Sequence, residues 1–293
     1  MNKQEVESFG RTRKLMQKYQ IQPKKSLGQN FLTDANLLQK IVEVADIDKK
    51  TNVLEIGPGM GALTKYLARL SHRVLALEID EEMLAVLEES LIDCPNVLIV
   101  NQDVLKVNLK KIVSEVFNED LPLKVVANLP YYITTPILIH LLESDLIIEK
   151  IVVMIQKEVS ERISANPSTK AYGSLSIAVQ YFMEAKIELM VPKTVFVPQP
   201  NVDSAILSLT RRDKPVVDVV DEHAFFRLTR ASFAMRRKTL WNNLTHAYGK
   251  DDQTTNWLLR AFEQAGIDPK RRGDSLFLQE FADLSNAMEE HKK

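Results

Sequence analysis

Short apolar runs alternate with helix-like stretches from residue 53 to residue 156, and this alternation constrains the fold more than any other feature. The apolar runs predict strands at 53–57, 74–80, 97–103, 124–129 and 150–156. The stretches between them predict helices at 63–70, 81–92 and 136–142. Strands separated by helices in this way form a parallel sheet with helices on both faces. The predicted fold class is therefore α/β, with a doubly wound, Rossmann-like sheet.

The pattern changes in the last third of the chain. Two further predicted strands, 176–191 and 204–211, are close in sequence and are joined by a proline-rich loop, and we expect them to form an antiparallel edge of the sheet. Beyond about residue 220 a helical periodicity replaces the strand pattern. Five apolar side chains fall within about 100° on a helical wheel: Phe225, Phe226, Phe233, Leu240 and Leu244.

The C-terminal end predicts one more helix, which Asp274 and Ser275 can cap. Its apolar residues are Leu276, Phe277, Phe281, Leu284 and Met288. A chain of 293 residues suits one large and one small domain. We expect a basic N-terminal extension (1–25), an α/β domain (26–212) and a small all-helical C-terminal domain (213–293).

Composition excludes several classes of protein. The chain is 45% hydrophobic and 26% charged, as in soluble globular proteins. Apolar runs such as 151–155 are too short to span a bilayer, and the first 25 residues lack the apolar core of a signal segment. The single Cys94 excludes an internal disulfide framework and a cysteine-rich zinc site. We therefore expect a cytoplasmic protein with no membrane partner and no bound metal.

The charges are segregated along the chain although the net charge is only −1. Residues 78–93 contain seven Asp and Glu and no Lys or Arg, whereas residues 223–246 contain five Lys and Arg and no Asp or Glu. This segregation indicates a basic face that could bind nucleic acid. An ordinary solvated surface accounts for the same run of charge equally well.

The ends of the first three predicted strands carry residues suited to a nucleoside. Ligands of doubly wound sheets bind at the carboxyl ends of the strands. Gly57 begins a glycine loop that lets a ligand approach the backbone, and Glu78 can accept the hydroxyls of a ribose. Asp103 is placed to accept from an adenine amino group. Together these residues predict a nucleoside-shaped site.

Each of these signals has an alternative interpretation. Gly57, Gly59 and Ala62 also satisfy the relaxed dinucleotide fingerprint, and both NAD and S-adenosylmethionine sites need an acidic residue after the second strand. The glycines alone are also consistent with a tight turn, and Asp103 alone with a helix cap. The occurrence of all three at successive strand ends favours a ligand site.

The fourth strand ends in Ala-Asn-Leu-Pro-Tyr-Tyr, residues 127–132. The side-chain oxygen of Asn128 and a main-chain carbonyl of Leu129 or Pro130 offer two hydrogen-bond acceptors, and Tyr131 offers a flat stacking surface. These groups suit an exocyclic amine on a heteroaromatic base. Hydride transfer typically uses a His, Lys or Tyr near an acidic partner, and no such pair occurs at this strand end. In isolation the same residues are consistent with a proline turn that buries Tyr131. Tyr132 is expected to serve in packing.

This arrangement predicts methyl transfer to an adenine amine. Acceptors for both amine hydrogens direct the nitrogen lone pair at the methyl group of S-adenosylmethionine, and positioning with electrostatics supplies most of the rate. A base within RNA or DNA must be unstacked to enter such a pocket. Phe196, in the proline-rich loop, is a candidate to hold that base, and a buried core residue is its alternative role.

Seven motifs, spread from residue 25 to residue 240, resemble one known family. They are Lys-Ser-Leu-Gly-Gln-Asn-Phe-Leu (25–32), Glu-Ile-Gly-Pro-Gly (55–59), Asn-Leu-Pro-Tyr (128–131), Gln-Lys-Glu-Val (156–159), Ala-Tyr-Gly-Ser-Leu-Ser (171–176), Val-Phe-Val-Pro-Gln-Pro-Asn-Val-Asp-Ser (195–204) and Phe-Ala-Met-Arg-Arg-Lys-Thr-Leu (233–240). The chain resembles the small-subunit ribosomal RNA adenine N6,N6-dimethyltransferases, whose bacterial member confers kasugamycin sensitivity.

The resemblance implies an S-adenosylmethionine-dependent enzyme that places two methyl groups on each of two adjacent adenosines near the 3′ end of 16S rRNA. The substrate would be the 30S subunit or its precursor, which implies a role in ribosome biogenesis, and the enzyme would act as a monomer. The 26–212 domain would bind cofactor and the 213–293 domain RNA. The matching motifs imply cofactor roles for Asn30, Leu32, Gly57, Glu78, Asp103 and Asn128.

The basic stretch fits an RNA partner. Four cations share an arc of about 100° on the helix predicted there: Arg227, Arg230, Arg237 and Lys238. They are expected to contact phosphates, which orient RNA while the pocket selects adenine. Arg236 falls toward the apolar side, where we expect it to pair internally.

Three rival functions remain open. The first is a large-subunit rRNA adenine methyltransferase, a class that uses Asn-Leu-Pro-Tyr in the same way. The long C-terminal match to the small-subunit family argues against it. An RNA-binding assembly factor in which catalysis is secondary is the second rival. A nicotinamide oxidoreductase is the third, and the lack of a hydride-site acid disfavours it.

Overall fold

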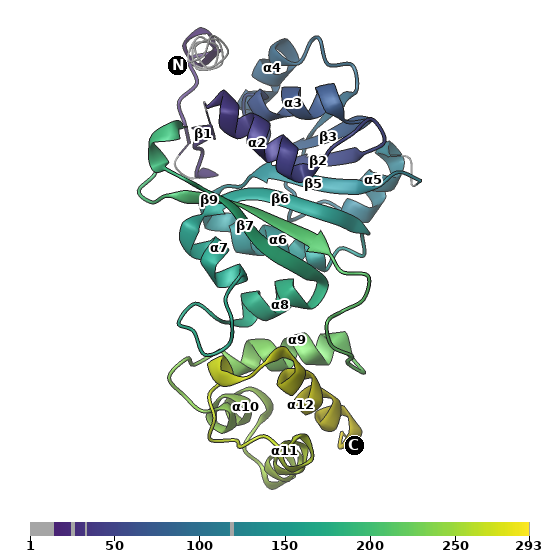
Figure 1. Ribbon diagram of the computed structural model, residues 1–293, viewed down its shortest axis with the longest axis vertical. Helices are drawn as coiled ribbons and strands as arrows, with labels where there is room; N and C mark the ends of the chain where they lie inside the picture. The colour runs from purple at the N-terminus through teal and green to yellow at the C-terminus, as the bar shows by residue number, and fades with distance from the viewer. Residues whose placement is uncertain (1–14, 25–26, 33, 118–119, 293) are drawn as a thin grey trace. The chain divides into compact units, whose positions relative to one another are not determined.

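The computed structural model describes residues 15–24, 27–32, 34–117 and 120–292, which form two compact units (Figure 1). The first unit comprises Met1–Ser160 and Ala185–Arg211, and the second comprises Glu161–Glu184 and Arg212–Lys293. The segment 161–184 thus packs with the C-terminal unit, whereas the sequence placed all of 26–212 in one domain. Of the expected N-terminal extension, residues 1–14 and 25 lie outside the described residues.

A seven-stranded sheet, counted over the described residues, forms the centre of the first unit, in the order β4-β3-β2-β5-β6-β9-β7. The strands are β2 (Asn52–Ile56), β3 (Arg73–Glu78), β4 (Val97–Asn101), β5 (Leu123–Asn128), β6 (Ile148–Gln156), β7 (Met183–Val191) and β9 (Ser204–Arg211). Strands β4, β3, β2, β5 and β6 run parallel, and β9 pairs antiparallel with β6. The five predicted strands are confirmed, and so is the strand at 204–211, which lies between β6 and the edge strand β7. The strand order reverses between β2 and β5, which is where such sheets bind ligands.

Helices cover both faces of this sheet, as the apolar strands require. They are α2 (Ala35–Ala45), α3 (Ala62–Leu70), α4 (Glu81–Ser90), α5 (Leu109–Val116) and α6 (Thr134–Leu142). Figure 1 shows α2 and α3 on one side of the sheet and α6 on the other. Leu38 and Leu67 of these helices pack with Val126 and Met154 of the strands in one buried cluster. Each such side chain contributes roughly 1.5–3 kcal/mol through burial, so this cluster fixes the layers.

One predicted strand is wrong over half its length. Residues 176–191 divide into the helix α8 (Ser174–Phe182) and the strand β7. Ile177, Val179 and Tyr181 alternate with less apolar residues, which imitates the period of a strand, but all three are buried on a helix. The hydroxyl of Ser176 accepts a hydrogen bond from the Gly173 amide at 3.0 Å and so caps the helix start.

Helices make up most of the second unit. After α8 they are α9 (Glu222–Ser232), α10 (Leu240–Tyr248), α11 (Asp252–Ala265) and α12 (Leu278–Glu290). Their shared core contains Phe225, Phe262 and Phe281 together with Tyr181. No helix in the described ranges of either unit is long and apolar enough to cross a membrane.

The single helical arc predicted through residues 225–244 is wrong because α9 ends at Ser232. Asn243, almost fully buried on α10, accepts a hydrogen bond from the Met235 amide at 2.9 Å and donates to the Ser232 carbonyl at 2.9 Å. These bonds satisfy the backbone of the turn that follows α9. Thr239 then caps α10, accepting from the Asn242 amide at 3.3 Å. Residues before and after the turn therefore belong to different helix faces.

The last helix also begins later than predicted. Asp274 and Ser275 lie in a short 3₁₀ turn, Gly273–Ser275, and α12 starts at Leu278. The Glu280 carboxylate accepts from the Phe277 amide at 2.8 Å and closes the helix start in place of the predicted cap. Phe277 itself is 62% exposed, so it does not share the buried face.

Candidate active site

The carboxyl ends of β2, β3, β4 and β5 open into a pocket of about 1140 Å³, a volume that includes its open mouth. The segment 27–32 forms a further wall of this pocket. Nine of the ten residues predicted for the cofactor and the chemistry line it: Asn30, Leu32, Gly57, Glu78, Asp103, Asn128, Leu129, Pro130 and Tyr131. The fold therefore brings these residues together at the reversal of strand order, while their individual roles stay predictions.

The glycine loop after β2 leaves room for a ligand. Gly57 has φ +69° and Gly59 has φ +56°, a region that disfavours residues with a Cβ. A Cβ on Gly57 would meet no atom within 4 Å, so the space in front of this glycine is open. A Cβ on Gly59 would lie 3.2 Å from the ring of Phe31. The loop thus offers its backbone to the pocket at Gly57 and packs on the 27–32 segment at Gly59.

Glu78 is held at the end of β3 with its carboxylate almost fully buried. One oxygen accepts from the Gly59 amide at 3.1 Å and the other from the Asp80 amide at 2.9 Å. Burial raises the pKa of Glu78 although these backbone bonds lower it. Each carboxylate oxygen has a second lone pair, so Glu78 keeps acceptor capacity for a diol.

Glu55, inside β2, is a site residue to which sequence reasoning gave no role. It lines the pocket, it is 1% exposed, and its Oε2 has no hydrogen-bond partner among the described residues. Burial raises its pKa to about 8, and the charge of Glu78 acts in the same direction. The sequence did contain a signal for Glu55, since it is a single acid between the apolar residues Leu54 and Ile56. A carboxyl group inside a buried strand needs a hydrogen-bonding or charged partner.

Asn128 is fixed by the segment that forms the pocket wall. Its side-chain amide donates to the main-chain carbonyl of Asn30 at 3.0 Å, and the side chain of Asn30 donates to the Gly28 carbonyl at 3.0 Å. With its NH₂ group held in this way, Asn128 keeps Oδ1 as an acceptor in the pocket. Asn30, which is predicted to bind the cofactor, thus also supplies the main-chain carbonyl that orients Asn128.

The structure also distinguishes between the two candidate carbonyls. The Pro130 carbonyl already accepts from the Ile133 amide at 3.3 Å and from Thr134 Oγ1 at 3.0 Å. The Leu129 amide donates to the Met154 carbonyl at 3.1 Å, which ties this residue to β6. The Leu129 carbonyl is therefore the better second acceptor beside Asn128.

The two tyrosines differ in their surroundings. Tyr131 lines the pocket half-buried, and its hydroxyl makes a 2.6 Å hydrogen bond with Ser204 Oγ. Burial raises the pKa of this hydroxyl, so Tyr131 stays neutral. Tyr132 was expected to serve in packing; it is 53% exposed, and its ring lies at the pocket wall beside Gly28. Tyr132 is therefore a rim residue and not part of the core.

Phe196 does not line the pocket. It forms the short strand β8 (Phe196–Val197), which pairs antiparallel with β1 (Phe31–Leu32) and places Phe196 opposite Leu32. Its side chain is 3% exposed and belongs to the same buried cluster as Val126 and Met154. The structure thus shows the alternative role that the sequence left open, a core residue, and a stacking role for Phe196 has no geometric support.

The predicted RNA-contacting cations are exposed but do not share one helix. Arg227 and Arg230 lie on α9, and Arg227 stands over the ring of Tyr248 at 5.6 Å. Arg237 and Lys238 lie in the turn between α9 and α10. Arg236 donates to the Lys170 carbonyl, which confirms its expected internal pairing.

A family model described as "Ribosomal RNA adenine dimethylase" matches residues 20–288. The chain belongs to this family. It is 59% identical over 288 residues to "Ribosomal RNA small subunit methyltransferase A" of Enterococcus faecalis and 56% identical over 283 residues to the protein of that name from Streptococcus sanguinis. These alignments cover 98% and 97% of this chain, and 98% of each relative. The resemblance inferred from the motifs is confirmed.

Solved structures agree with this membership. A dimethyladenosine transferase from Plasmodium falciparum aligns with a TM-score of 0.71 at 26% identity, over 87% of this chain and 95% of that one. The 23S rRNA methyltransferase ErmE aligns with a TM-score of 0.63 at 26% identity, over 89% of this chain and 100% of that one. The fold is that of S-adenosylmethionine-dependent methyltransferases, and this chain is such an enzyme.

The residues of the pocket fit S-adenosylmethionine. The buried Oε2 of Glu55 lacks a partner among the described residues, and the ammonium group of a methionine moiety is a suitable one. The open space at Gly57 admits a ligand against the backbone, and Glu78 keeps lone pairs for ribose hydroxyls. Asp103 borders the pocket, and its Oδ1 accepts from the Leu105 amide at 3.0 Å within a turn. The helix cap that was its alternative role belongs to Asn108, which caps α5.

Proposed function

We propose that this chain dimethylates N6 of two adjacent adenosines near the 3′ end of 16S rRNA in the 30S subunit or its precursor. It would act as a cytoplasmic monomer in ribosome biogenesis. One observation carries the proposal: the Asn128 amide, oriented by the Asn30 carbonyl, stands in the same pocket as Gly57 and Glu78. Relatives named for the small-subunit RNA, which align over nearly the whole chain, support the choice of substrate.

The chemistry needs an adenine amine whose lone pair points at a methyl donor. The amine nitrogen is a weak nucleophile because its lone pair is delocalised into the ring. Asn128 Oδ1 and the Leu129 carbonyl can accept its two hydrogens, which favours a pyramidal nitrogen. S-adenosylmethionine, when bound, supplies the electrophilic methyl group. Orientation of the amine by two fixed acceptors then supplies much of the rate without a strong general base.

Tyr131 would hold the ring of the target base. Its hydroxyl is fixed by Ser204, which keeps the aromatic face in one orientation at the pocket. A base reaches this position only when it is unstacked from its neighbours in the RNA. The predicted stacking partner Phe196 is buried, so Tyr131 carries this role in the proposal.

The second unit would contact the phosphates of the RNA. Arg227 and Arg230 on α9, with Arg237 and Lys238 in the following turn, present exposed cations. Such contacts contribute affinity and register without reading sequence, whereas the pocket selects adenine. The proposed division of labour therefore assigns cofactor and base to the first unit and RNA backbone to the second.

The test is transfer of labelled methyl groups from S-adenosylmethionine to 30S particles that lack these methylations, followed by nucleoside analysis. N6,N6-dimethyladenosine should form on 30S particles and not on purified 50S particles. Its appearance on 50S particles alone would favour the large-subunit activity that the name of ErmE describes. Absence of dimethyladenosine from both substrates, with S-adenosylmethionine bound normally, would refute the proposal.

A further inference from the structure

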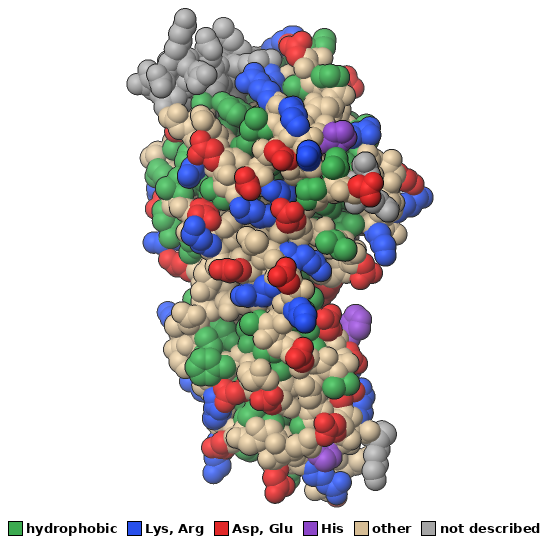
Figure 2. Space-filling model, turned by 45° about the vertical axis from the view of Figure 1, so that its right-hand side comes forward, with side chains coloured by type: hydrophobic (Ala, Val, Ile, Leu, Met, Phe, Trp, Pro, Cys, Tyr) green, Lys and Arg blue, Asp and Glu red, His purple; other side chains and the backbone are tan. Residues whose placement is uncertain are grey.

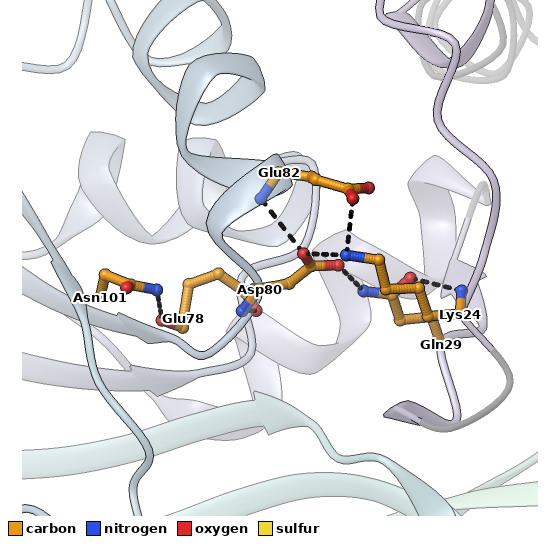
Figure 3. A network of polar contacts seen from close by, with 6 residues as sticks. All are labelled: Lys24, Gln29, Glu78, Asp80, Glu82 and Asn101. Atoms are coloured by element: carbon orange, nitrogen blue, oxygen red, sulfur yellow. Dashed lines mark hydrogen bonds and ion pairs between the residues drawn. The ribbon is translucent and has the colours of Figure 1, made fainter.

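A partly buried polar network joins the pocket wall to the start of α4 (Figure 3). Asp80 Oδ1 accepts from Lys24 Nζ at 2.7 Å, and Asp80 Oδ2 accepts from Gln29 Nε2 at 2.7 Å. Gln29 Oε1 in turn accepts from the Lys24 amide at 2.9 Å. Lys24 also pairs with Glu82 at 3.0 Å. We call Lys24, Gln29 and Asp80 the latch, and residues 27–32 the strap.

Asp80 has more partners than a helix cap needs. Its side chain is 1% exposed, and Oδ1 also accepts from the Glu82 amide at 3.1 Å, which caps α4. Burial alone would raise the pKa of Asp80, but the bonds from Lys24 and Gln29 lower it below its ordinary value. The carboxylate is therefore ionised and pairs with groups from the N-terminal side of the pocket, so cutting these bonds leaves a buried charge.

The strap connects the latch to the catalytic amide. Gln29 lies within the strap, and the next residue, Asn30, supplies the carbonyl that accepts from Asn128. On its other side the strap is confined by Tyr132, because a Cβ on Gly28 would stand 2.8 Å from that ring. Beyond Asn30, β1 is fixed by its pairing with β8. A shift of Gln29 would therefore move both a wall of the cofactor pocket and the group that orients Asn128.

We propose that Lys24 and Gln29 are positioning residues, which act through Asp80 to hold the strap against the cofactor pocket and to orient the Asn128 amide. The inference rests on the proposed function for its catalytic part, whereas its cofactor part concerns binding alone. Asp80 follows Glu78 by two residues, so one short segment supplies both a ligand-facing carboxylate and the anchor of the opposing wall.

The test uses Lys24→Met and Gln29→Leu, which remove the latch donors and leave the cap of α4 intact. Each should raise the Kd of S-adenosylmethionine, measured by calorimetry without RNA, by about tenfold. Each should also lower kcat at saturating cofactor by about three- to tenfold, because Asn128 is less well oriented. Lys24→Arg, which keeps the charge, should restore most of both values.

A matched control separates the latch from general attachment of the N-terminal segment. Lys18 pairs with Glu89 of α4, and these side chains are 60% and 41% exposed. Lys18→Met should change cofactor affinity and kcat by less than about twofold. In the Asp80→Asn background, which keeps a capping oxygen, Lys24→Met should add less than about twofold.

Two results would overturn the inference. One is wild-type affinity and kcat in both Lys24→Met and Gln29→Leu. The other is an equal loss in Lys18→Met, which would show that only the attachment of residues 15–24 matters. Since cofactor binding is measured without RNA, these results remain distinct from a failure of the wild-type enzyme to methylate 30S particles.

Discussion

The pocket of the first unit and the basic stretch of the second unit place their charged groups in opposite environments. In the first unit Glu78 and Asp80 are almost fully buried, and each carboxylate is held by two or more hydrogen bonds. In the second unit the cations of the α9 helix and the turn after it, such as Arg237 and Lys238, are exposed. Figure 2, which shows one face of the molecule, displays side chains of both charge signs at the surface.

This contrast indicates how each unit responds to substitution. A buried, multiply bonded group has a fixed position, so its loss changes geometry and leaves partners unsatisfied. An exposed cation contributes a screened charge, so its loss changes affinity by a small, salt-dependent amount. We therefore expect large effects in the pocket and small ones on the basic turn.

The largest effect should follow from removing the amide at the end of β5. Asn128→Ala should lower kcat for methyl transfer by about 10² to 10³-fold, because one of two fixed acceptors is lost. Asn286→Ala is the matched control in the second unit, where Asn286 bonds the 218–220 backbone. Single-turnover kinetics should show wild-type rates for Asn286→Ala, and an equal loss in both variants would contradict the contrast.

A second effect concerns pH, and its sign should differ between two glutamates. The pKa of Glu55 is raised by burial to about 8, so its contribution to stability is present below its ordinary value of 4.5 and is lost as pH rises to 8. From pH 5 to pH 8 wild type should therefore lose roughly 3 kcal/mol relative to Glu55→Gln in denaturant titrations.

Glu280 of the second unit supplies the opposite case. The hydrogen bond from Arg271 lowers the pKa of Glu280 below 4.5, so its contribution is present above pH 4.5 and is lost on acidification. Wild type should therefore lose stability relative to Glu280→Gln only as pH falls below 4.5. If stability relative to the Gln variant followed the same pH trend for Glu55 and for Glu280, burial would not distinguish the two sites.

A smaller effect should separate two glycines with nearly the same backbone conformation. Gly57 has φ +69°, Gly266 at the end of α11 has φ +66°, and a Cβ at either would meet nothing within 4 Å. Changing either to alanine should therefore cost about 1 to 2 kcal/mol of stability through backbone strain. Only Gly57→Ala should also weaken cofactor binding, by about tenfold, because its methyl group enters the ligand space. Calorimetry that finds equal cofactor affinity in both variants would remove Gly57 from the site.

The smallest effect should come from the basic turn. Arg237→Glu together with Lys238→Glu should weaken RNA binding by about tenfold at moderate salt and lower the salt slope by about one per lost phosphate contact. Cofactor affinity should stay unchanged. Lys250→Glu together with Arg260→Glu, at other exposed positions of the same unit, makes the same change in net charge and serves as the control. Filter binding over a salt series measures both quantities, and an unchanged slope would exclude the turn from the RNA face.

Much of the first unit was predictable because its information is local. Each parallel strand is an apolar run bounded by polar residues, and the pocket acids Glu78 and Asp103 lie at or just beyond the ends of their strands. The strands fix where these side chains meet, so sequence position alone located them. The segment 176–182 was the exception, since buried Ile177, Val179 and Tyr181 carry the alternation of a strand on a helix.

The remaining features depend on contacts between residues far apart in sequence. Asn243 of α10 bonds the backbone of the turn that follows α9. No local pattern therefore predicted that Arg230 would lie on α9 and Arg237 in the turn after it. The Asn30 carbonyl acts through the backbone, which gives no residue-type signal. Whether Phe196 was buried or exposed depended on its pairing with Leu32 across the chain.

The most direct test of the central claim is mass-spectrometric mapping of methylated nucleotides after reaction with unmethylated 30S particles. The account predicts N6,N6-dimethyladenosine at two adjacent positions near the 3′ end of 16S rRNA for wild type, and none for Asn128→Ala. Dimethylation elsewhere in the RNA, or undiminished modification by Asn128→Ala, would contradict it.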